Sequence, residues 1–314
     1  MTPRARQIDR PMEHLFRPSQ RVAMRSVTIP GTLPKAGLDR QPARYLLRQD
    51  QYAKWFVRDQ RPRQTCIAHA VAACVEVLRA GRGDPLVPLS AQFLYWYMRT
   101  LPWSGDRPPG WAYGATRLGY AKSVLASHGI CREAICRDGD LPSGAPPEGS
   151  APSRAARREA ADNLIPDGDY WYFPDPSARS SGIARRVYDL LADGRPVAIA
   201  LPEFSHSRGS SVTNWYNPTS WSSGIVADPP EGHLVSSSGG LSVSGHAVCV
   251  IGFEPDPAGG WFLFRNSVGK DWAYLFGEPN AAVPDVPSSG YGAISARQVE
   301  AFCWEMFSPK LPYG

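Results

Sequence analysis

The chain has 314 residues, of which 43% are hydrophobic and 20% are charged, a composition that is ordinary for a soluble globular protein. Its 31 prolines and 29 glycines predict many turns and long loops, and they exclude a simple helical bundle. No run of 18 apolar residues occurs, so we expect no membrane-spanning helix.

The net charge of +5 is concentrated near the N-terminus. Residues 1–50 hold ten Lys and Arg against four Asp and Glu, so the rest of the chain is close to neutral. Prolines spaced along this stretch prevent long helices. We therefore predict a basic arm, either a solvated tail or a docking segment for an acidic partner. Nucleic-acid binding is not expected, because no basic stripe with interleaved aromatic residues accompanies the arm.

The next part of the chain, 51–155, predicts helices. The first is expected over 66–80, where apolar side chains recur with the helical period at Ile67, Ala70, Val71, Cys74, Val75 and Leu78. Two more are expected over 91–100 and from about 115 to 128. A Pro-, Gly- and Ser-rich stretch at 138–155 then predicts a loop and the boundary between two lobes.

The remaining part, 156–314, is dominated by predicted strands. Residues 182–202 are typical of a helix, a glycine turn and a strand. Residues 205–245 form a long Ser- and Gly-rich stretch of the kind that is usually functional or mobile. Two apolar runs at 246–254 and 260–267 flank a turn and predict a β-hairpin. Helices followed by strands indicate an α+β protein.

Cys66 lies in the first turn of a predicted helix, where backbone N–H groups and the helix dipole favour a thiolate. The thiolate is the nucleophilic form of cysteine, and an imidazolium beside it can lower the thiol pKa from about 8.5 to roughly 3–4. Catalysis also needs a base for the proton and donors for the oxyanion. A cysteine among apolar residues is more commonly a core residue, so Cys66 by itself does not decide the function.

The sequence around Cys66 resembles the active-site segment of the papain family of cysteine peptidases. It is VRDQRPRQTCIAHAVAACVE, and in the family a glutamine lies six residues before the nucleophile, as Gln60 does here. The resemblance implies that the Gln60 side chain and the Cys66 backbone N–H form the oxyanion hole.

A second stretch, SGHAVCVIGFEPDPAGGWFLFRNSVGKDW, is similar to the family's histidine and asparagine strands. The start of the first strand and the end of the second meet in a hairpin, so His246 and Asn266 can lie together. The resemblance implies that His246 is the base, that Asn266 orients it, and that the Trp272 indole shields their bond from water.

Further blocks match the family in order, and they are LSAQFLYW (89–96), GRPVAIAL (194–201) and GYGAIS (290–295). Gly114 resembles the glycine whose backbone pairs with substrate. We expect Gly114, Gly245, Ala247 and Trp272 to line the substrate site, and the small residues around His246 favour an apolar substrate side chain.

Four positions depart from the family pattern. A half-cystine is replaced by Arg63, a glycine by Gln64, an aromatic residue by Ile67, and the first tryptophan of the asparagine motif by Val268. No disulfide is therefore expected at Arg63. The first residues lack the apolar core of a secretory signal, so the six cysteines predict reduced thiols in a cytoplasmic protein.

The sequence thus predicts a papain-like, two-lobed α+β fold. The helical lobe is expected at 51–155, and an antiparallel β-sheet or barrel lobe at 156–314, with the active site between them. The resemblance implies an endopeptidase that forms a thioester at Cys66, acts on a protein or peptide, and needs no metal or cofactor. If activity is restrained, the arm, the long loop or a regulatory protein partner must restrain it.

Two alternatives use the same scaffold. One is an acyl transferase or peptide ligase, in which the thioester passes to an amine instead of water. The other is a binding module that keeps the fold without catalysis.

Overall fold

A computed structural model describes residues 36–38, 42–47, 55–103, 107–108, 111, 114–139, 148–173, 182–204, 212–226, 228–229, 244–274 and 289–312. Most of the arm expected at 1–50 lies outside these residues. So do large parts of the loops expected near 138–155 and 205–245.

The helices of the described residues are α1 (Cys66–Gly81), α2 (Ala91–Thr100), α3 (Leu118–Ser127), α4 (Arg154–Ala161), α5 (Ile183–Ala192), α6 (Pro218–Ser223) and α7 (Ala296–Phe302). The strands are β1 (Tyr45–Leu46), β2 (Asp167–Tyr172), β3 (Val197–Glu203), β4 (Ile225–Val226), β5 (Ser244–Glu254), β6 (Trp261–Arg265), β7 (Tyr291–Ser295) and β8 (Glu305–Lys310). Among the helices of the described residues, none has the length and apolar character that a bilayer span requires.

The strands form one sheet in the order β2-β8-β3-β5-β6-β7-β4. The pairings are antiparallel except for β4 with β7, which is parallel. β1 pairs with β5 at Gly252 and Phe253, which follow the residues of β5 that pair with β3. The last part of the predicted arm therefore joins the sheet. The predicted hairpin is present as β5 and β6, and the predicted α+β class is confirmed.

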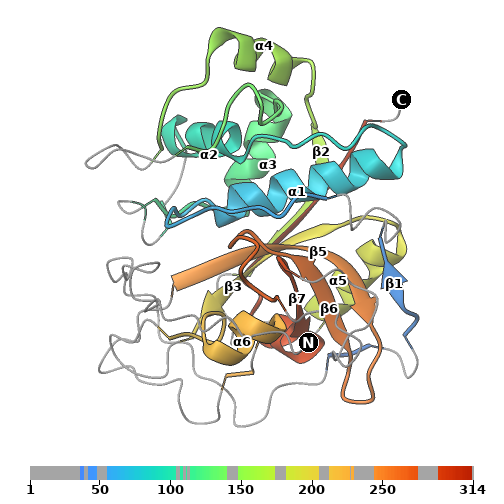
Figure 1. Cartoon of the computed structure of the whole chain (residues 1–314). Helices are drawn as coiled ribbons and strands as arrows, with labels where there is room; N and C mark the ends of the chain where they lie inside the picture. Colours follow the sequence, from blue (N-terminus) through green and yellow to red (C-terminus); the bar gives the residue numbers. More distant parts are fainter. Residues whose placement is uncertain are drawn as a thin grey trace, which may run out of the picture.

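Helices and sheet occupy different parts of the molecule (Figure 1). Helices α1 to α4 lie on one side, and most of the sheet lies on the other with α5 and α6. α1 runs along the boundary and packs against β5, β3 and β8. It is buried on nearly all sides over its first twelve residues, whereas the sequence predicted one apolar face. The predicted core residue Leu78 is only partly buried, because it lies where α1 leaves the sheet.

Side chains from distant strands cap two of the helices. Glu305 of β8 accepts the N–H of Leu118 at 2.6 Å, which satisfies a free donor at the start of α3. Glu300 accepts from the N–H groups of Gly182 and Ala184 in the same way at α5. α3 therefore begins three residues later than the predicted position 115, where the distant carboxylate caps it.

α4 belongs to the helical side, although it spans the expected lobe boundary at 155. Arg132, just after α3, forms a bidentate ion pair with Glu159 of α4. Arg79 of α1 donates to Asn163 at 2.8 Å, directly after α4. A division of the chain at 155 would cut this helix.

A buried carboxylate of α1 joins the two sides. Glu76 accepts from Arg58 and from the N–H of Leu89, and it pairs with Arg265 of β6 at 3.2 Å. All three charged side chains are at most 5% exposed. Two buried guanidinium groups from different parts of the chain thus share one carboxylate.

We predict that Glu76→Gln lowers the free energy of unfolding by about 3–5 kcal/mol, because both guanidinium groups lose their buried counter-charge. Urea denaturation followed by tryptophan fluorescence measures this loss. Asp189→Asn is the matched control, since it removes an exposed ion pair with Arg185 whose loss costs less than about 1 kcal/mol. Equal losses in the two variants would contradict the prediction.

Candidate active site

The packing of α1 on β5 brings the Cys66 thiol to the backbone of Ala247, the residue that follows His246. Farther along both elements, the sulfur atoms of Cys74 and Cys249 are 3.3 Å apart. Cys66 lies about 12 Å from Cys74 toward the N-terminus of the helix, and His246 lies about 10 Å from Cys249 toward the N-terminus of the strand. The backbone N–H of Ala247 hydrogen-bonds toward the Cys66 thiol, so the two elements run in the same direction and their first residues meet.

The Cys66 side chain is 7% exposed, and this burial dominates its chemistry. Burial raises the pKa of the thiol to about 11, although the backbone N–H groups around the sulfur act to lower it. The sequence had predicted a lowered thiol pKa from the helix start. The structure differs because loss of water around a buried sulfur outweighs the helix dipole.

His246 is held by Asn266, whose Oδ1 lies 2.7 Å from Nε2 of the imidazole. The same Oδ1 accepts the backbone N–H of Ser267 at 2.8 Å, so this atom must be the amide oxygen. An oxygen acceptor requires the proton on Nε2 of His246. Nδ1 therefore carries the lone pair and is the ring atom that can take a proton. Burial lowers the pKa of His246 to about 4, which keeps the imidazole neutral at pH 7.

Gln60 is tied to the segment that follows Asn266. Its backbone N–H donates to Ser267 O at 2.7 Å, and its Oε1 accepts from the Ser267 hydroxyl at 2.6 Å. Nε2 of Gln60 donates one of its two hydrogens to Arg63 O at 2.8 Å. The carboxamide is thus held at both ends, at the first residue of the turn Gln60–Arg63 that leads to Cys66.

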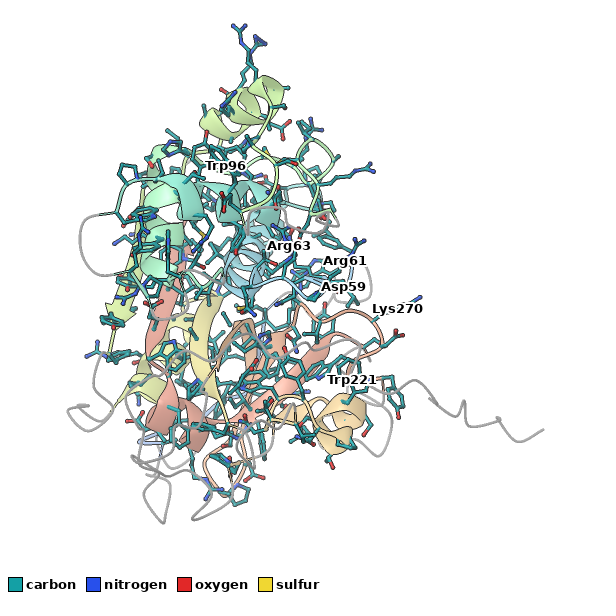
Figure 2. The ribbon with its side chains drawn as sticks, turned by 90° about the vertical axis from the view of Figure 1, so that its left-hand side faces the viewer. Asp59, Arg61, Arg63, Trp96, Trp221 and Lys270 are labelled. Atoms are coloured by element: carbon teal, nitrogen blue, oxygen red, sulfur yellow. The ribbon has the colours of Figure 1, made fainter. Side chains whose placement is uncertain are left out.

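Arg63 and Asp138 anchor this turn to the helical side. Asp138 forms an ion pair with Arg63, and Arg63 also donates to Gln92 of α2 at 2.7 Å. His69 lies between Asp138 and Arg58, 3.0 Å and 3.2 Å away. Burial and the two nearby arginines lower the pKa of His69, so it is a neutral bridge. Figure 2 shows Arg63 beside α1, where helices and sheet meet.

Aromatic rings cover His246 on the sheet side. Trp215 lies edge-on to the imidazole, with ring centres 5.0 Å apart, and the Tyr216 ring is 5.9 Å away. Trp272, predicted to shield the histidine, is fully buried and packs on Phe264 at 5.9 Å. Phe264 in turn contacts Trp215 at 5.7 Å. The indole placed against His246 is therefore that of Trp215, with Trp272 two rings away.

Solved structures with this fold are known, although no protein-family model and no curated protein matches the sequence. Xylellain, a cysteine protease from Xylella fastidiosa, matches with a TM-score of 0.59 at 18% identity, over 95% of this chain and 99% of that chain. Digestive procathepsin L 3 of Tenebrio molitor larval midgut gives 0.54 at 17% identity, over 93% and 77%. The Carica candamarcensis cysteine protease CMS1MS2, solved with E-64, gives 0.51 at 17% identity, over 87% and 100%.

The chain has a papain-like fold. The predicted two-lobed architecture is thereby confirmed. Arg63, expected at the half-cystine position of the family pattern, forms a buried ion pair with Asp138 that ties the turn before Cys66 to the helical lobe. An ionic contact here stands where the family pattern has a covalent one.

Three of the residues expected to line the substrate site adjoin Gln64, His246 and the Cys66 thiol, and they are Gly114, Gly245 and Ala247. Gly114 has φ of +105°, and an added Cβ would lie 2.6 Å from the Tyr95 hydroxyl and 3.1 Å from Gln64, so only glycine fits beside the turn. Gly245 precedes His246 and is covered by Trp304, which a Cβ would meet at 2.4 Å. Ala247 is buried, with its N–H at the Cys66 thiol.

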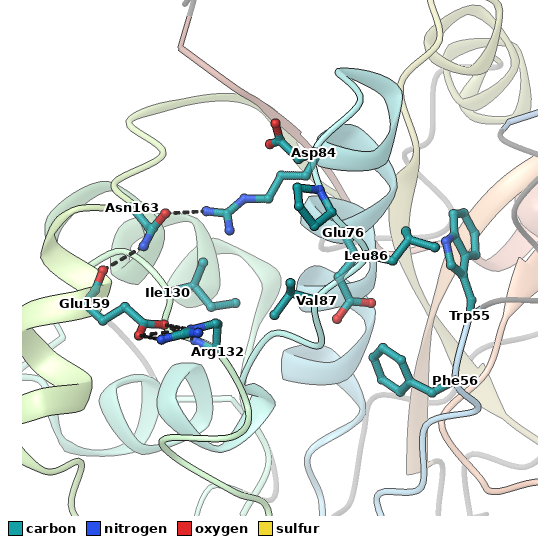
Figure 3. A pocket seen from close by; sticks show the side chains of 12 residues that line it. Trp55, Phe56, Glu76, Asp84, Leu86, Val87, Ile130, Arg132, Glu159 and Asn163 are labelled. Atoms are coloured by element: carbon teal, nitrogen blue, oxygen red, sulfur yellow. Dashed lines mark hydrogen bonds and ion pairs between the residues drawn. The ribbon is translucent and has the colours of Figure 1, made fainter.

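A cavity of about 380 Å³ lies elsewhere, beside the second half of α1 (Figure 3). Trp55 and Phe56 form one wall. Opposite them, Arg132 pairs with Glu159 and Arg79 donates to the Asn163 side chain. Neither Cys66 nor its partners line this cavity, so it is separate from the candidate active site.

Sequence reasoning missed Asp138, Trp215 and Ser267. Ser267 directly follows Asn266, and its position at a strand end next to a candidate catalytic residue was a usable signal. Asp138 and Trp215 lie in stretches predicted as loops. Isolated polar or aromatic residues in loops have no periodicity, so no local pattern indicates which of them turn inward.

We predict that the buried, neutral His246 makes the protein acid-sensitive. Its folded pKa of about 4 lies below the unfolded value of 6.5, so its stabilising contribution is present above pH 6.5 and is lost as the pH falls toward 4. The free energy of unfolding of the wild type should fall by about 3 kcal/mol more than that of His246→Gln between pH 7 and pH 4. Urea denaturation at both pH values measures the difference.

The partly exposed His128 provides the control. His128→Gln should follow the wild type closely, because its imidazole is less buried and its pKa less lowered. A His246→Gln variant that loses as much stability in acid as the wild type would refute a neutral, buried imidazole.

Proposed function

We propose that the chain is a cysteine peptidase that cleaves peptide bonds through a thioester at Cys66. The bond between Asn266 and Nε2 of His246 carries the proposal, because it leaves Nδ1 as the ring atom that can accept a proton. The next residue, Ala247, has its backbone N–H at the Cys66 thiol. The papain-like fold, shared with solved cysteine proteases, supports it.

The reaction would begin with proton transfer from the Cys66 thiol to Nδ1 of His246 as the sulfur attacks the peptide carbonyl. Both groups are neutral at rest, so His246 acts as a general base rather than as a preformed imidazolium. The oxyanion would accept two hydrogen bonds, one from the second Nε2 hydrogen of Gln60 and one from the backbone N–H of Cys66. Asn266 keeps the imidazole oriented throughout.

The leaving amine would then take the proton from His246, and the acyl group would remain on Cys66 as a thioester. Water, deprotonated by the same imidazole, would attack the thioester and restore the thiol. We propose that the Gly114 backbone pairs with the substrate chain, and that a substrate side chain lies near Gly245 and Ala247, the small residues that flank His246. For Trp272 we propose an indirect part, through Phe264 and Trp215.

The substrate we propose is a protein or peptide, in a cytoplasmic setting. The ion pair between Arg63 and Asp138 does not depend on an oxidising compartment, unlike the disulfide of the family pattern. Residues 1–50 carry the excess positive charge and could bind an acidic regulatory partner.

We predict that wild-type protein cleaves peptides from a proteome-derived library and that Cys66→Ala abolishes cleavage. His246→Ala should lose about 10²-fold or more in kcat/KM, because the general base is gone. Mass spectrometry of the products measures both. Cys136→Ser is the matched control, since this partly exposed thiol lies outside the site.

Products joined to an added amine, with little hydrolysis, would assign the chain to acyl transfer instead. Two results together would reject catalysis and leave a binding module. One is the absence of any product, and the other is a rate of Cys66 alkylation by iodoacetamide that is the same in wild type and in His246→Ala.

A further inference from the structure

Glu203 places an acidic side chain beside the candidate nucleophile. It is the last residue of β3, and the β3–β5 register puts Leu201 opposite His246. Paired residues share a face of the sheet, and so do residues two apart in a strand. Glu203 therefore projects from the face that carries His246. It lies about 7 Å along β3 from Leu201, the residue that pairs with His246.

The charge of the Glu203 carboxylate acts on the Cys66 sulfur. This charge raises the pKa of the Cys66 thiol and also that of the Tyr216 hydroxyl, whose ring lies 5.9 Å from the imidazole. Glu203 is partly exposed, so a substrate can meet it. Among the described residues, it is the acidic group whose charge acts on the Cys66 thiol.

The backbone around Glu203 is fixed on both sides. Pro202 O accepts from the Trp215 indole at 3.2 Å. Phe204 exchanges hydrogen bonds with Asn214, with its N–H 2.8 Å from Oδ1 and its carbonyl 2.9 Å from the Asn214 N–H. A side chain held on such a frame can discriminate between substrates, because little ordering is needed on binding.

The chemistry of the reaction decides which part of the substrate lies near Glu203. The imidazole must protonate the leaving amine, so the part of the substrate that follows the scissile bond lies on the His246 side of the sulfur. Glu203 shares the face and the neighbouring strand of His246. Its carboxylate therefore faces the leaving-group side.

We propose that Glu203 is a specificity-determining residue that selects substrates with a Lys or Arg side chain directly after the scissile bond. The inference rests on the proposed peptidase function and adds the substrate class. A carboxylate attracts a cationic side chain and repels an acidic one, and a single partly exposed pair changes affinity by up to about fivefold.

The first test uses peptides. From a sequence that the wild type cleaves, three peptides carry Lys, Gln or Glu at the residue that follows the cleaved bond. The wild type should show about a fivefold higher kcat/KM for Lys than for Glu. Glu203→Gln, which keeps the shape and removes the charge, should bring the ratio close to one. Asp162→Asn, on the exposed end of α4, should leave it unchanged.

The second test does not require proteolysis. Cys66 is modified with a cationic or an anionic methanethiosulfonate, 2-(trimethylammonium)ethyl or 2-sulfonatoethyl, from which the thiolate displaces methanesulfinate to form a mixed disulfide. Peptide mapping follows the rate at Cys66 alone. The ratio of the cationic to the anionic modification rate should fall about fivefold in Glu203→Gln relative to wild type and to Asp162→Asn.

The outcomes separate this inference from the proposed function. Peptides cleaved by the wild type with equal rates for Lys and Glu would overturn the role of Glu203 and leave the peptidase intact, even if the Gln variant failed to fold. The role of Glu203 would also be overturned if folded Glu203→Gln kept the wild-type ratio of cationic to anionic modification rates at Cys66. No cleavage of any peptide by the wild type would overturn the peptidase and this specificity with it.

Discussion

A chain of buried polar groups between the two lobes is the constraint on which the site depends. It runs from Arg265 through Glu76, Arg58 and His69 to Asp138 and Arg63. Each end adjoins the site: Arg265 precedes Asn266, and Arg63 holds Gln60 through its carbonyl. Removing Glu76 would leave Arg58 and Arg265 without their shared counter-charge, which costs several kcal/mol. The network therefore fixes the relative position of the lobes where the reacting groups meet.

Burial that makes the site rigid also sets its protonation state. The Cys66 thiol and the His246 imidazole are both shielded from water, so each favours its neutral form. The proton transfer proposed between them would leave the net charge of the pair unchanged. The bond from Asn266 leaves the proton-accepting nitrogen as Nδ1. A neutral pair with one defined route for the proton suits general-base attack by a cysteine.

The papain-like fold keeps its arrangement here with different local contacts. Arg63 and Asp138 hold the turn before the nucleophile by charge, and Trp215 covers the histidine where the family pattern indicates Trp272. Glu203 adds a charge near the sulfur. Such replacements are compatible with one fold at 18% identity, because the backbone geometry depends on the packing of α1 against the sheet more than on any single contact.

The sequence by itself determined the elements with strong periodicity or motif spacing: the helix that begins at Cys66, the hairpin that carries His246 and Asn266, and the papain-like α+β class. It did not indicate the parts that depend on distant partners. The start of α3 follows from Glu305, nearly two hundred residues away, and the raised thiol pKa follows from burial by several elements at once. Asp138 and Glu203 acquire their roles only through tertiary contacts. Local patterns report which face of an element is apolar, whereas electrostatics and capping depend on which groups the fold brings together.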